Sequence, residues 1–194
     1  MRYLPLLLTA ALTTGVLFGT PGAQAQPAPA TLVAQQSEIN FISKQMGVPV
    51  DGHFRKFDAK IALDPKQPAS GSVALSVDLA SATVGFAETD AELPKSEWFN
   101  TAKFPQATFK STAIKGLGGG KFEVTGQLSI KGSTRDVVVP VVLTQSNGVS
   151  VASGAFAIKR LEFKIGEGEW ADTSTVANDV QVKFKLALRG ISAL

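Results

Sequence analysis

Alternation of apolar and polar residues is the dominant pattern of this chain, and it is clearest over residues 176–188. One face of that segment carries Val176, Val180, Val182, Phe184, Leu186 and Leu188, and the opposite face carries Asp179, Gln181, Lys183, Lys185 and, just beyond, Arg189. A helix would scatter these residues around its circumference, whereas a half-buried strand separates them into two faces. The segment is therefore predicted to be a β-strand with one dry and one wet face.

The same alternation recurs along the rest of the chain. It is clear over residues 57–63, 71–79 and 121–131, and weaker over residues 37–44, 107–115, 135–144 and 149–160. Turn signals separate these segments: Asn147-Gly148 is a strong hairpin signal because both residues accept positive φ, and Gly118-Gly119-Gly120 separates two other segments. Together the segments predict about eight strands joined mostly by hairpins.

Only the connection over residues 81–103 interrupts this series of hairpins. Thr89 or Asp90 is a suitable N-cap for a helical turn, and Pro94 suits the first turn of a second short helix that runs to Trp98 or Phe99. The sequence therefore predicts a short helical loop near residues 88–100.

An up-and-down series of about eight antiparallel strands with one polar face closes on itself, because closure removes the unpaired edges. The predicted fold is an all-β, antiparallel β-barrel. The interior of such a barrel holds either packed side chains or one small ligand, and the pattern leaves both open. The candidates for the inner wall, and for contact with a ligand, are Phe41, Val73, Leu75, Val77, Phe109, Phe122, Leu128, Ile130, Phe156, Ile158, Val180, Val182 and Phe184.

The predicted strand over residues 135–144 differs from the others because both of its faces are apolar. Val138 and Val142 lie on the face that should be wet, and Pro140 cannot donate to a ladder, so it marks a bulge or an edge. Either the helical loop or a second copy of the chain is expected to cover Val138 and Val142, and a homodimer is one of these two outcomes.

Residues 1–25 are predicted to be a secretory signal peptide. Arg2 is the only charged residue among them, residues 4–18 are apolar, and Ala23-Gln24-Ala25 matches an A-x-A cleavage site. Cleavage after Ala25 leaves a flexible leader over residues 26–30 and one domain over residues 31–190. The expected location of the mature protein is the periplasm.

Composition excludes several classes of protein. The chain has no cysteine, so its stability must come from the core and the hydrogen-bonded strands rather than from disulfides. Removal of Arg2 lowers the formal net charge from +3 to +2, and charges of both signs are interspersed without the basic stripe that nucleic-acid binding requires. A membrane-embedded barrel is disfavoured because Lys183, Lys185 and Arg189 would face the lipid.

No residue set stands out as a catalytic or metal site. His53 is the only histidine and no G-x-S-x-G motif is present. With one histidine and no cysteine, a zinc site would depend mainly on carboxylates. A calcium site needs at least about six oxygen ligands on a loop of defined geometry, so a solvated loop is the favoured interpretation of Glu162, Glu167, Glu169 and Asp172. No catalysis, metal or cofactor is therefore expected.

Two glycine-rich segments match phosphate-binding loops only in part. Residues 116–121 lack the P-loop spacing, and Phe122 stands where a Ser or Thr would bind magnesium. Residues 166–171 match G-x-G-x-x-A, but Glu167 and Glu169 would repel a pyrophosphate and no helical pattern follows. The favoured interpretations are a hairpin turn and an ordinary loop.

Several motifs occur in a fixed order along the chain. They are Gly52-His53-Phe54 with Phe57, Leu93 with Trp98-Phe99, Phe104-Pro105-x-Ala107-Thr108-Phe109-x-Ser111, Gly126-x-Leu128-x-Ile130-x-Gly132 with Thr134, and Phe156-x-Ile158-x-Arg160 with Phe163. In these motifs the chain, over about residues 31–188, resembles the YceI-like family of polyisoprenoid-binding proteins. The resemblance implies an exported lipocalin-like β-barrel with a helical loop. It also implies a bound isoprenoid or other long-chain lipid, held for carriage or sequestration.

One segment departs from the family pattern. Several relatives carry Arg and His around an R-D-x-H-L portion, where this chain has Thr89-Asp90-Ala91-Glu92-Leu93. This departure favours a neutral head group, such as a quinone or an amide, over a pyrophosphate. Two alternatives to a lipid carrier stay open: a filled barrel with a structural or stress-related interaction role, and an enzyme that acts on a lipid head group through His53 or the acidic residues.

Overall fold

The computed structural model describes residues 27–194, so the predicted signal peptide and its cleavage site lie outside the described residues. One antiparallel sheet contains the described strands, in the order β1-β4-β5-β7-β8-β9-β10-β11-β2-β3-β6. Their bounds are β1 Pro29–Leu32, β2 Glu38–Gln45, β3 Val48–Phe54, β4 Phe57–Ala62, β5 Ser72–Asp78, β6 Ala82–Thr83, β7 Gln106–Gly118, β8 Lys121–Ile130, β9 Ser133–Ser146, β10 Val149–Lys159 and β11 Asp179–Arg189.

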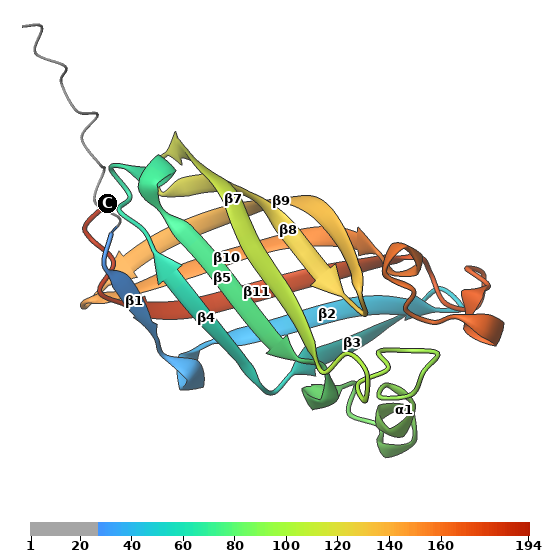
Figure 1. Cartoon of the computed structure of the whole chain (residues 1–194). Coiled ribbons are helices and arrows are strands. Elements are labelled where there is room, and N and C mark those ends of the chain that lie inside the picture. Colours follow the sequence, from blue (N-terminus) through green and yellow to red (C-terminus); the bar gives the residue numbers. More distant parts are fainter. Residues whose placement is uncertain (1–26) are drawn as a thin grey trace, which may run out of the picture.

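The sheet closes into a barrel through β1, as Figure 1 shows. β1 pairs with β4 on one side and with the end of β11 on the other, where Thr31 lies opposite Arg189. Eight strands, from β1 through β4, β5 and β7–β10 to β11, therefore form a complete ring, which confirms the predicted all-β barrel. β2 pairs with the first half of β11, and β3 and β6 extend the sheet beyond it.

The short 3-10 helix η1 (Ala34–Gln36) separates β1 from β2, and Ser37 bridges the break. The Ser37 hydroxyl donates to the Val33 carbonyl at 2.8 Å and accepts the Ala187 backbone N–H at 2.9 Å. The Val33 backbone N–H in turn donates to the Ala187 carbonyl. The backbone N–H and carbonyl of Ala187 are therefore both hydrogen-bonded at the point where the neighbour of β11 changes from β1 to β2.

The two predicted glycine turns are confirmed as hairpins. Asn147 and Gly148 join β9 to β10 and both have positive φ, at 50° and 75°. Gly118, Gly119 and Gly120 are also left-handed and connect β7 to β8. Pro140 lies outside the β9–β10 ladder, which covers only residues 142–146 of β9, while on its other side it pairs opposite Glu123 of β8. Its placement in a stretch of β9 with one unpaired edge agrees with the prediction that Pro140 marks a bulge or an edge.

The predicted helical loop contains one α-helix, α1 (Ala87–Glu92), followed by turns over residues 93–103. The prediction of a second helix starting at Pro94 was wrong, because backbone bonds such as Asn100 to Lys95 and Phe104 to Asn100 close separate turns. The N-cap prediction was also wrong, because Thr89 and Asp90 both lie within α1 and Phe86 occupies the N-cap position. The Asp90 carboxylate instead accepts from the Thr83 hydroxyl at 2.5 Å and from the Val84 backbone N–H at 2.7 Å. These two hydrogen bonds hold the pKa of Asp90 below its ordinary value.

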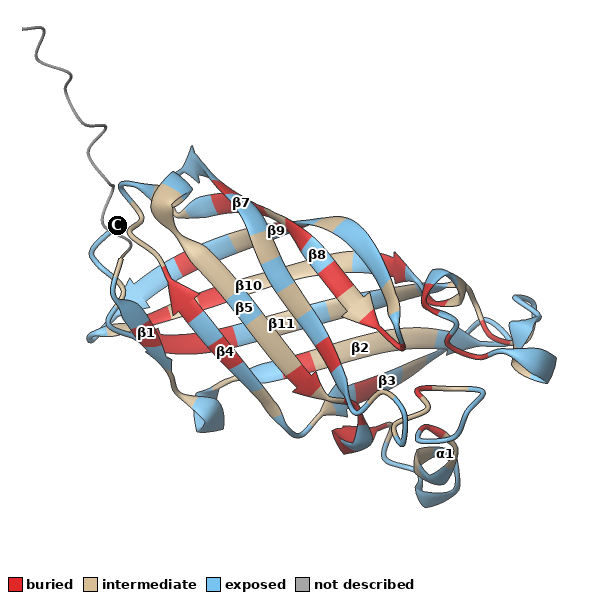
Figure 2. Ribbon diagram, viewed as in Figure 1, coloured by how far each residue is buried: buried red, intermediate tan, exposed pale blue. Residues whose placement is uncertain are grey.

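The N-terminal boundary of the domain also differs from the prediction. Pro29 and Ala30 belong to β1 and pair with Ala62 and Ile61, whereas the leader was expected to extend to residue 30. Figure 2 shows how burial alternates along the strands, as the sequence pattern predicted. The buried residues come from every strand of the ring and from the loops at one end, and they form a single apolar core.

Candidate functional site

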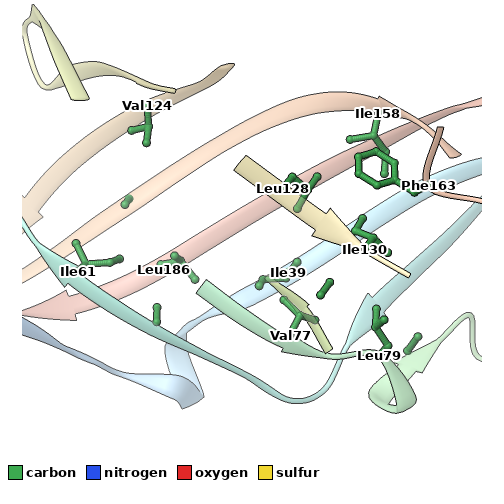
Figure 3. Packing of buried hydrophobic residues seen from close by; sticks show 14 of the residues in the cluster. Ile39, Ile61, Val77, Leu79, Val124, Leu128, Ile130, Ile158, Phe163 and Leu186 are labelled. Carbon is green, nitrogen blue, oxygen red and sulfur yellow. The ribbon is translucent and has the colours of Figure 1, made fainter. Parts of the chain in front are cut away.

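The barrel encloses an apolar cavity of about 230 Å³. Figure 3 shows inward side chains from β2, β4, β5, β8, β10 and β11 that converge on the interior. An apolar cavity of about 150 Å³ is already large enough to stay dry and bind benzene. The barrel is therefore not completely filled by its own side chains.

The structure places all the predicted inner-wall residues on the lining of this cavity. They are Phe41, Val73, Leu75, Val77, Phe109, Phe122, Leu128, Ile130, Phe156, Ile158, Val180, Val182 and Phe184. Their alternation with polar neighbours is the reason, since every second side chain of a closed barrel faces inward. Their contact with a ligand stays a prediction.

Three of the phenylalanines lie against glycines of the barrel wall. A Cβ atom built on Gly52 would be 2.2 Å from the Phe41 ring, one on Gly126 would be 2.5 Å from the Phe109 ring, and one on Gly154 would be 2.6 Å from the Phe184 ring. None of these glycines has positive φ, so space rather than backbone conformation requires glycine here. The missing side chains let the rings settle toward the wall, which leaves room in the centre.

The helical loop and the segment after β10 supply lining residues that alternation did not predict. Leu93, Trp98 and Phe99 come from the first segment, and Arg160 and Ile165 from the second. The two segments meet at the carbonyl of Glu97, which accepts the backbone N–H groups of Gly166 at 2.8 Å and Glu167 at 2.9 Å. The Trp98 and Trp170 rings lie 5.6 Å apart across the same junction. Both segments lie at the same end of the barrel in Figure 1, and these contacts join them there.

Arg160 is the central residue of this closure, and only 1% of it is exposed. Its guanidinium donates to five backbone carbonyls: Nε to Ala177 at 3.1 Å, Nη1 to Ile165 and Gly166 at 2.9 Å each, and Nη2 to Trp170 at 2.6 Å and Val176 at 2.7 Å. All five donors of an arginine are thereby used. Burial lowers the pKa of Arg160, but arginine keeps its proton in proteins.

Lys131 is the second buried cation of this end, and its exposed fraction is 5%. Its ammonium donates to the carbonyls of Lys164 at 2.5 Å and Glu97 at 3.3 Å, and to the Glu167 carboxylate at 2.9 Å. Lys131 therefore joins the turn between β8 and β9 to the helical loop and to the segment after β10, which together are called the closing segments. Like Arg160, it has no donor left for a further partner.

His53 and the acidic residues considered in the sequence analysis do not come together in a catalytic or metal site. His53 lies exposed on β3, opposite Asn40 and Thr83. Glu162 pairs with Arg135 at 3.7 Å, Glu167 with Lys131, and Asp172 with Ser174. Over residues 27–194, no group of three or more His, Cys, Asp or Glu residues is arranged to hold a metal ion.

The glycine-rich segment over residues 166–171 forms a loop with the 3-10 helix η5 (Gly168–Ala171), without the strand-to-helix turn of a dinucleotide site. Within the described residues, no helix has both the length and the apolar character needed to span a membrane.

Fold and site together define a closed antiparallel β-barrel with an apolar internal cavity. The model of the YceI-like domain matches residues 31–188, and the chain therefore belongs to this family, which confirms the resemblance seen in its motifs. A UPF0312 protein of Azotobacter vinelandii is 35% identical over 106 residues, and Protein YceI of Escherichia coli O157:H7 is 34% identical over 110 residues. These matches cover 54% and 56% of this chain, and the chain spans only 55% and 57% of the length of these two relatives.

Solved structures show the same architecture. BcnA of Burkholderia cenocepacia superimposes with a TM-score of 0.79 at 41% identity, covering 81% of this chain and 99% of that protein. A domain from Saccharophagus degradans, described as polyisoprenoid binding, superimposes with a TM-score of 0.67 at 19% identity, covering 85% of this chain and 99% of that domain. The second likeness shows a shared fold alone.

Proposed function

We propose that this protein binds one long apolar molecule inside its barrel, for carriage or sequestration, and catalyses no reaction. The composition of the cavity wall carries this proposal. Among the lining residues only Ser43, Trp98 and Arg160 have polar side-chain atoms, and the donors of Arg160 are all used by backbone carbonyls. Such a wall favours an apolar ligand with few polar groups.

The hydrophobic effect is sufficient to hold such a ligand. Each methylene group removed from water contributes about 0.8 kcal/mol, so a tail of about ten buried carbons gains about 8 kcal/mol. Ordering of the ligand and its lost translational freedom offset several kcal/mol of that gain. Affinity therefore rises with the length of chain that the cavity admits, and no charged clamp is needed.

The ligand class that we propose is an isoprenoid or a similar long-chain lipid. A relative of the same fold is described as a polyisoprenoid-binding domain, which supports this choice. A branched isoprenoid tail also suits a wall built from Val, Leu, Ile and Phe side chains, whose branched and planar shapes pack against methyl branches.

We also propose that the protein works after export, in the periplasm. The support is the sequence of residues 1–25 alone, with its apolar run and the A-x-A site at Ala23-Gln24-Ala25. Sequencing the N-terminus of the protein from a periplasmic fraction tests this directly. The expected first residue is Gln26, and a protein that retains residues 4–18 would contradict both cleavage and location.

Native mass spectrometry of the protein purified from its own host tests the binding function. The expected spectrum contains a complex heavier than the bare chain, from which collisional activation releases a long-chain apolar compound. A spectrum of bare chain alone, from protein never exposed to detergent or organic solvent, favours the filled-barrel alternative. Turnover of a lipid head group that is lost in His53→Ala would instead support an enzyme.

A further inference from the structure

The apolar wall of the barrel cavity is tightly packed at both of its ends. Beside the β7–β8 and β9–β10 hairpins, Phe122, Leu143 and Leu188 line the cavity and are at most 5% exposed. At the opposite end, Leu93 and Phe99 of the helical loop line it and are also buried. A ligand that moved along the barrel axis would have to displace several of these close-packed side chains at once.

The side wall of the barrel has a gap in its backbone pairing between β2 and β4. β4 pairs with β5 along its whole length, but with β1 only at Ile61 and Ala62. β2 pairs with β11 on one side and with β3 on the other. Within the described chain, no ladder therefore joins β2 to residues 57–60 of β4.

A surface cleft of about 670 Å³ lies at this gap. Its lining comes from η1, the start of β2, the end of β3, the turn that follows and the first residue of β4. Among residues 27–194, only Ile39 and Phe54 line both the cleft and the barrel cavity. The two residues lie opposite each other in the β2–β3 ladder. This pair of side chains therefore forms the partition between the cleft and the cavity.

Phe54 is the movable side chain of this partition. Its ring lies 5.4 Å from the Phe41 ring and 6.2 Å from the Phe99 ring, and it is still partly exposed. Ile39 is only 4% exposed, and its branched side chain is stiff at χ1. The turn after Phe54 is held by two backbone N–H groups that donate to Ser81, at 3.2 and 3.0 Å. Rotation of the Phe54 ring, rather than movement of the backbone, therefore opens the partition.

The cleft outside the partition is polar, in contrast to the cavity wall. Its polar side chains are those of Glu38, Asn40, His53, Arg55 and Lys56. An amphiphile that enters here keeps its polar end hydrated while its tail passes the partition. The transfer therefore avoids the free-energy cost of taking an unpaired polar group out of water.

We propose that a ligand enters and leaves the barrel from the side, through this cleft, when the Phe54 ring turns away from Ile39. The inference rests on the proposed function, because it requires an apolar chain that occupies the cavity. Phe54 then controls the rate of ligand exchange, and the closing segments keep their place during that exchange.

A covalent strap across the cleft tests this route. The chain has no cysteine, so Glu38→Cys/Lys56→Cys supplies the only two thiols, at exposed positions of the cleft, and a bismaleimide links them. Gln127→Cys/Asp136→Cys, an exposed facing pair on β8 and β9, is the matched control. Stopped-flow fluorescence measures association and release of a long-chain probe.

The strap should slow both association and release by about tenfold or more. The dissociation constant should stay within about twofold of the control, because the strap lies outside the cavity and changes both rates together. Exchange as fast as in the linked control would overturn the inference. Failure of the wild type to bind the probe would instead contradict the proposed function itself.

Two single variants compare the side entrance with the closing segments. Phe54→Ala removes the ring from the partition and should raise the association rate by about threefold to tenfold. Trp170→Ala loosens the junction of the closing segments, where its ring lies 5.6 Å from that of Trp98, without changing the cavity wall. Its association rate should equal that of the wild type. An unchanged rate in Phe54→Ala, or a faster one in Trp170→Ala, would overturn the inference.

Discussion

The ring of Phe41 occupies the space where a side chain of Gly52 would begin: a methyl group on Gly52 would lie 2.2 Å from Phe41 Cζ. The two residues face each other in the β2–β3 ladder. Gly52 lacks a positive φ, and the three atoms nearest to the added methyl group all belong to the Phe41 ring, so the ring excludes a larger residue. The pair shows how a small barrel wall accommodates a large apolar side chain without filling its centre.

Gly52→Ala is predicted to move the Phe41 ring into the cavity. If the ring displaces about two methylene groups of a ligand, the affinity for a long-chain probe falls about tenfold. The overpacking should also lower the free energy of unfolding by about 1–3 kcal/mol. Probe titration and urea denaturation measure the two effects.

The double variant Phe41→Leu/Gly52→Ala is the control, because the smaller leucine leaves space for the methyl group. Gly52→Ala should cost less stability in this background than in the wild type. An equal cost in both backgrounds would show that the ring is not what excludes a side chain at this position. Gly154→Ala gives a further contrast, since its methyl group would also meet the Pro140 carbonyl oxygen, which cannot swing away as a ring does.

Arg160→Lys is predicted to destabilise the closed end of the barrel. A lysine has three donors, so at least two of the five carbonyls that Arg160 satisfies would lose their partner. We expect the free energy of unfolding to fall by about 3 kcal/mol, measured by urea denaturation. Arg189→Lys, at an exposed position at the end of β11, should change it by less than about 0.5 kcal/mol. Equal stability of the two variants would refute the structural role of Arg160.

Much of the barrel could be predicted from the sequence, because burial on one face imposes a period of two. β11 shows this directly: Val180, Val182 and Phe184 line the cavity, while Lys183 and Lys185 are exposed. β1 and β6 could not be found in this way, since four and two residues are too short to establish a period. β3 was also missed, because Pro49 and Gly52 interrupt its alternation.

The closing segments of the cavity could not be predicted from the pattern. Trp98 and Arg160 lie outside the regular strands, so no periodicity indicates which way their side chains point. The burial of Arg160 depends on carbonyls contributed by residues 165–177, whose positions only the folded loop defines. The single available signal was the presence of both residues in motifs shared with the YceI-like family.

The outer face of β9 is predicted to mediate self-association. Val138 and Val142 are 53% and 42% exposed, so the helical loop does not cover them. Of the two partners that the sequence analysis expected for this apolar face, only a second copy of the chain is left. Val138→Lys should therefore lower the mass in solution, measured by analytical ultracentrifugation, from that of a dimer to that of one chain. Gln127→Lys, on the exposed face of the neighbouring β8, should leave the mass unchanged. A wild-type protein that sediments as a single chain would contradict this prediction.

The Asp90 carboxylate is predicted to make stability depend on pH in the acidic range. Its hydrogen bonds from Thr83 and Val84 lower its pKa in the folded state. The stabilisation is therefore fully present above the unfolded-state pKa of about 3.9 and is lost as the pH falls through the lower folded-state pKa. Asp90→Asn should lower the thermal melting temperature at neutral pH, and its difference from the wild type should shrink below about pH 4. Asp58→Asn, an exposed position on β4, is the control. A difference between Asp90→Asn and the wild type that stays constant from neutral to acid pH would contradict this assignment.

Titration of the delipidated protein with a fluorescent long-chain probe tests the central claim most directly, because it asks whether the barrel cavity admits an apolar chain. The wild type should bind the probe saturably. Phe184→Trp, which narrows the cavity, should bind it more weakly, and Lys183→Ala, on the wet face of β11, should bind it as the wild type does. If the cavity has no room for a ligand, the added bulk of Phe184→Trp instead costs about 1–3 kcal/mol of stability. A wild-type barrel that binds no probe after delipidation would contradict the account.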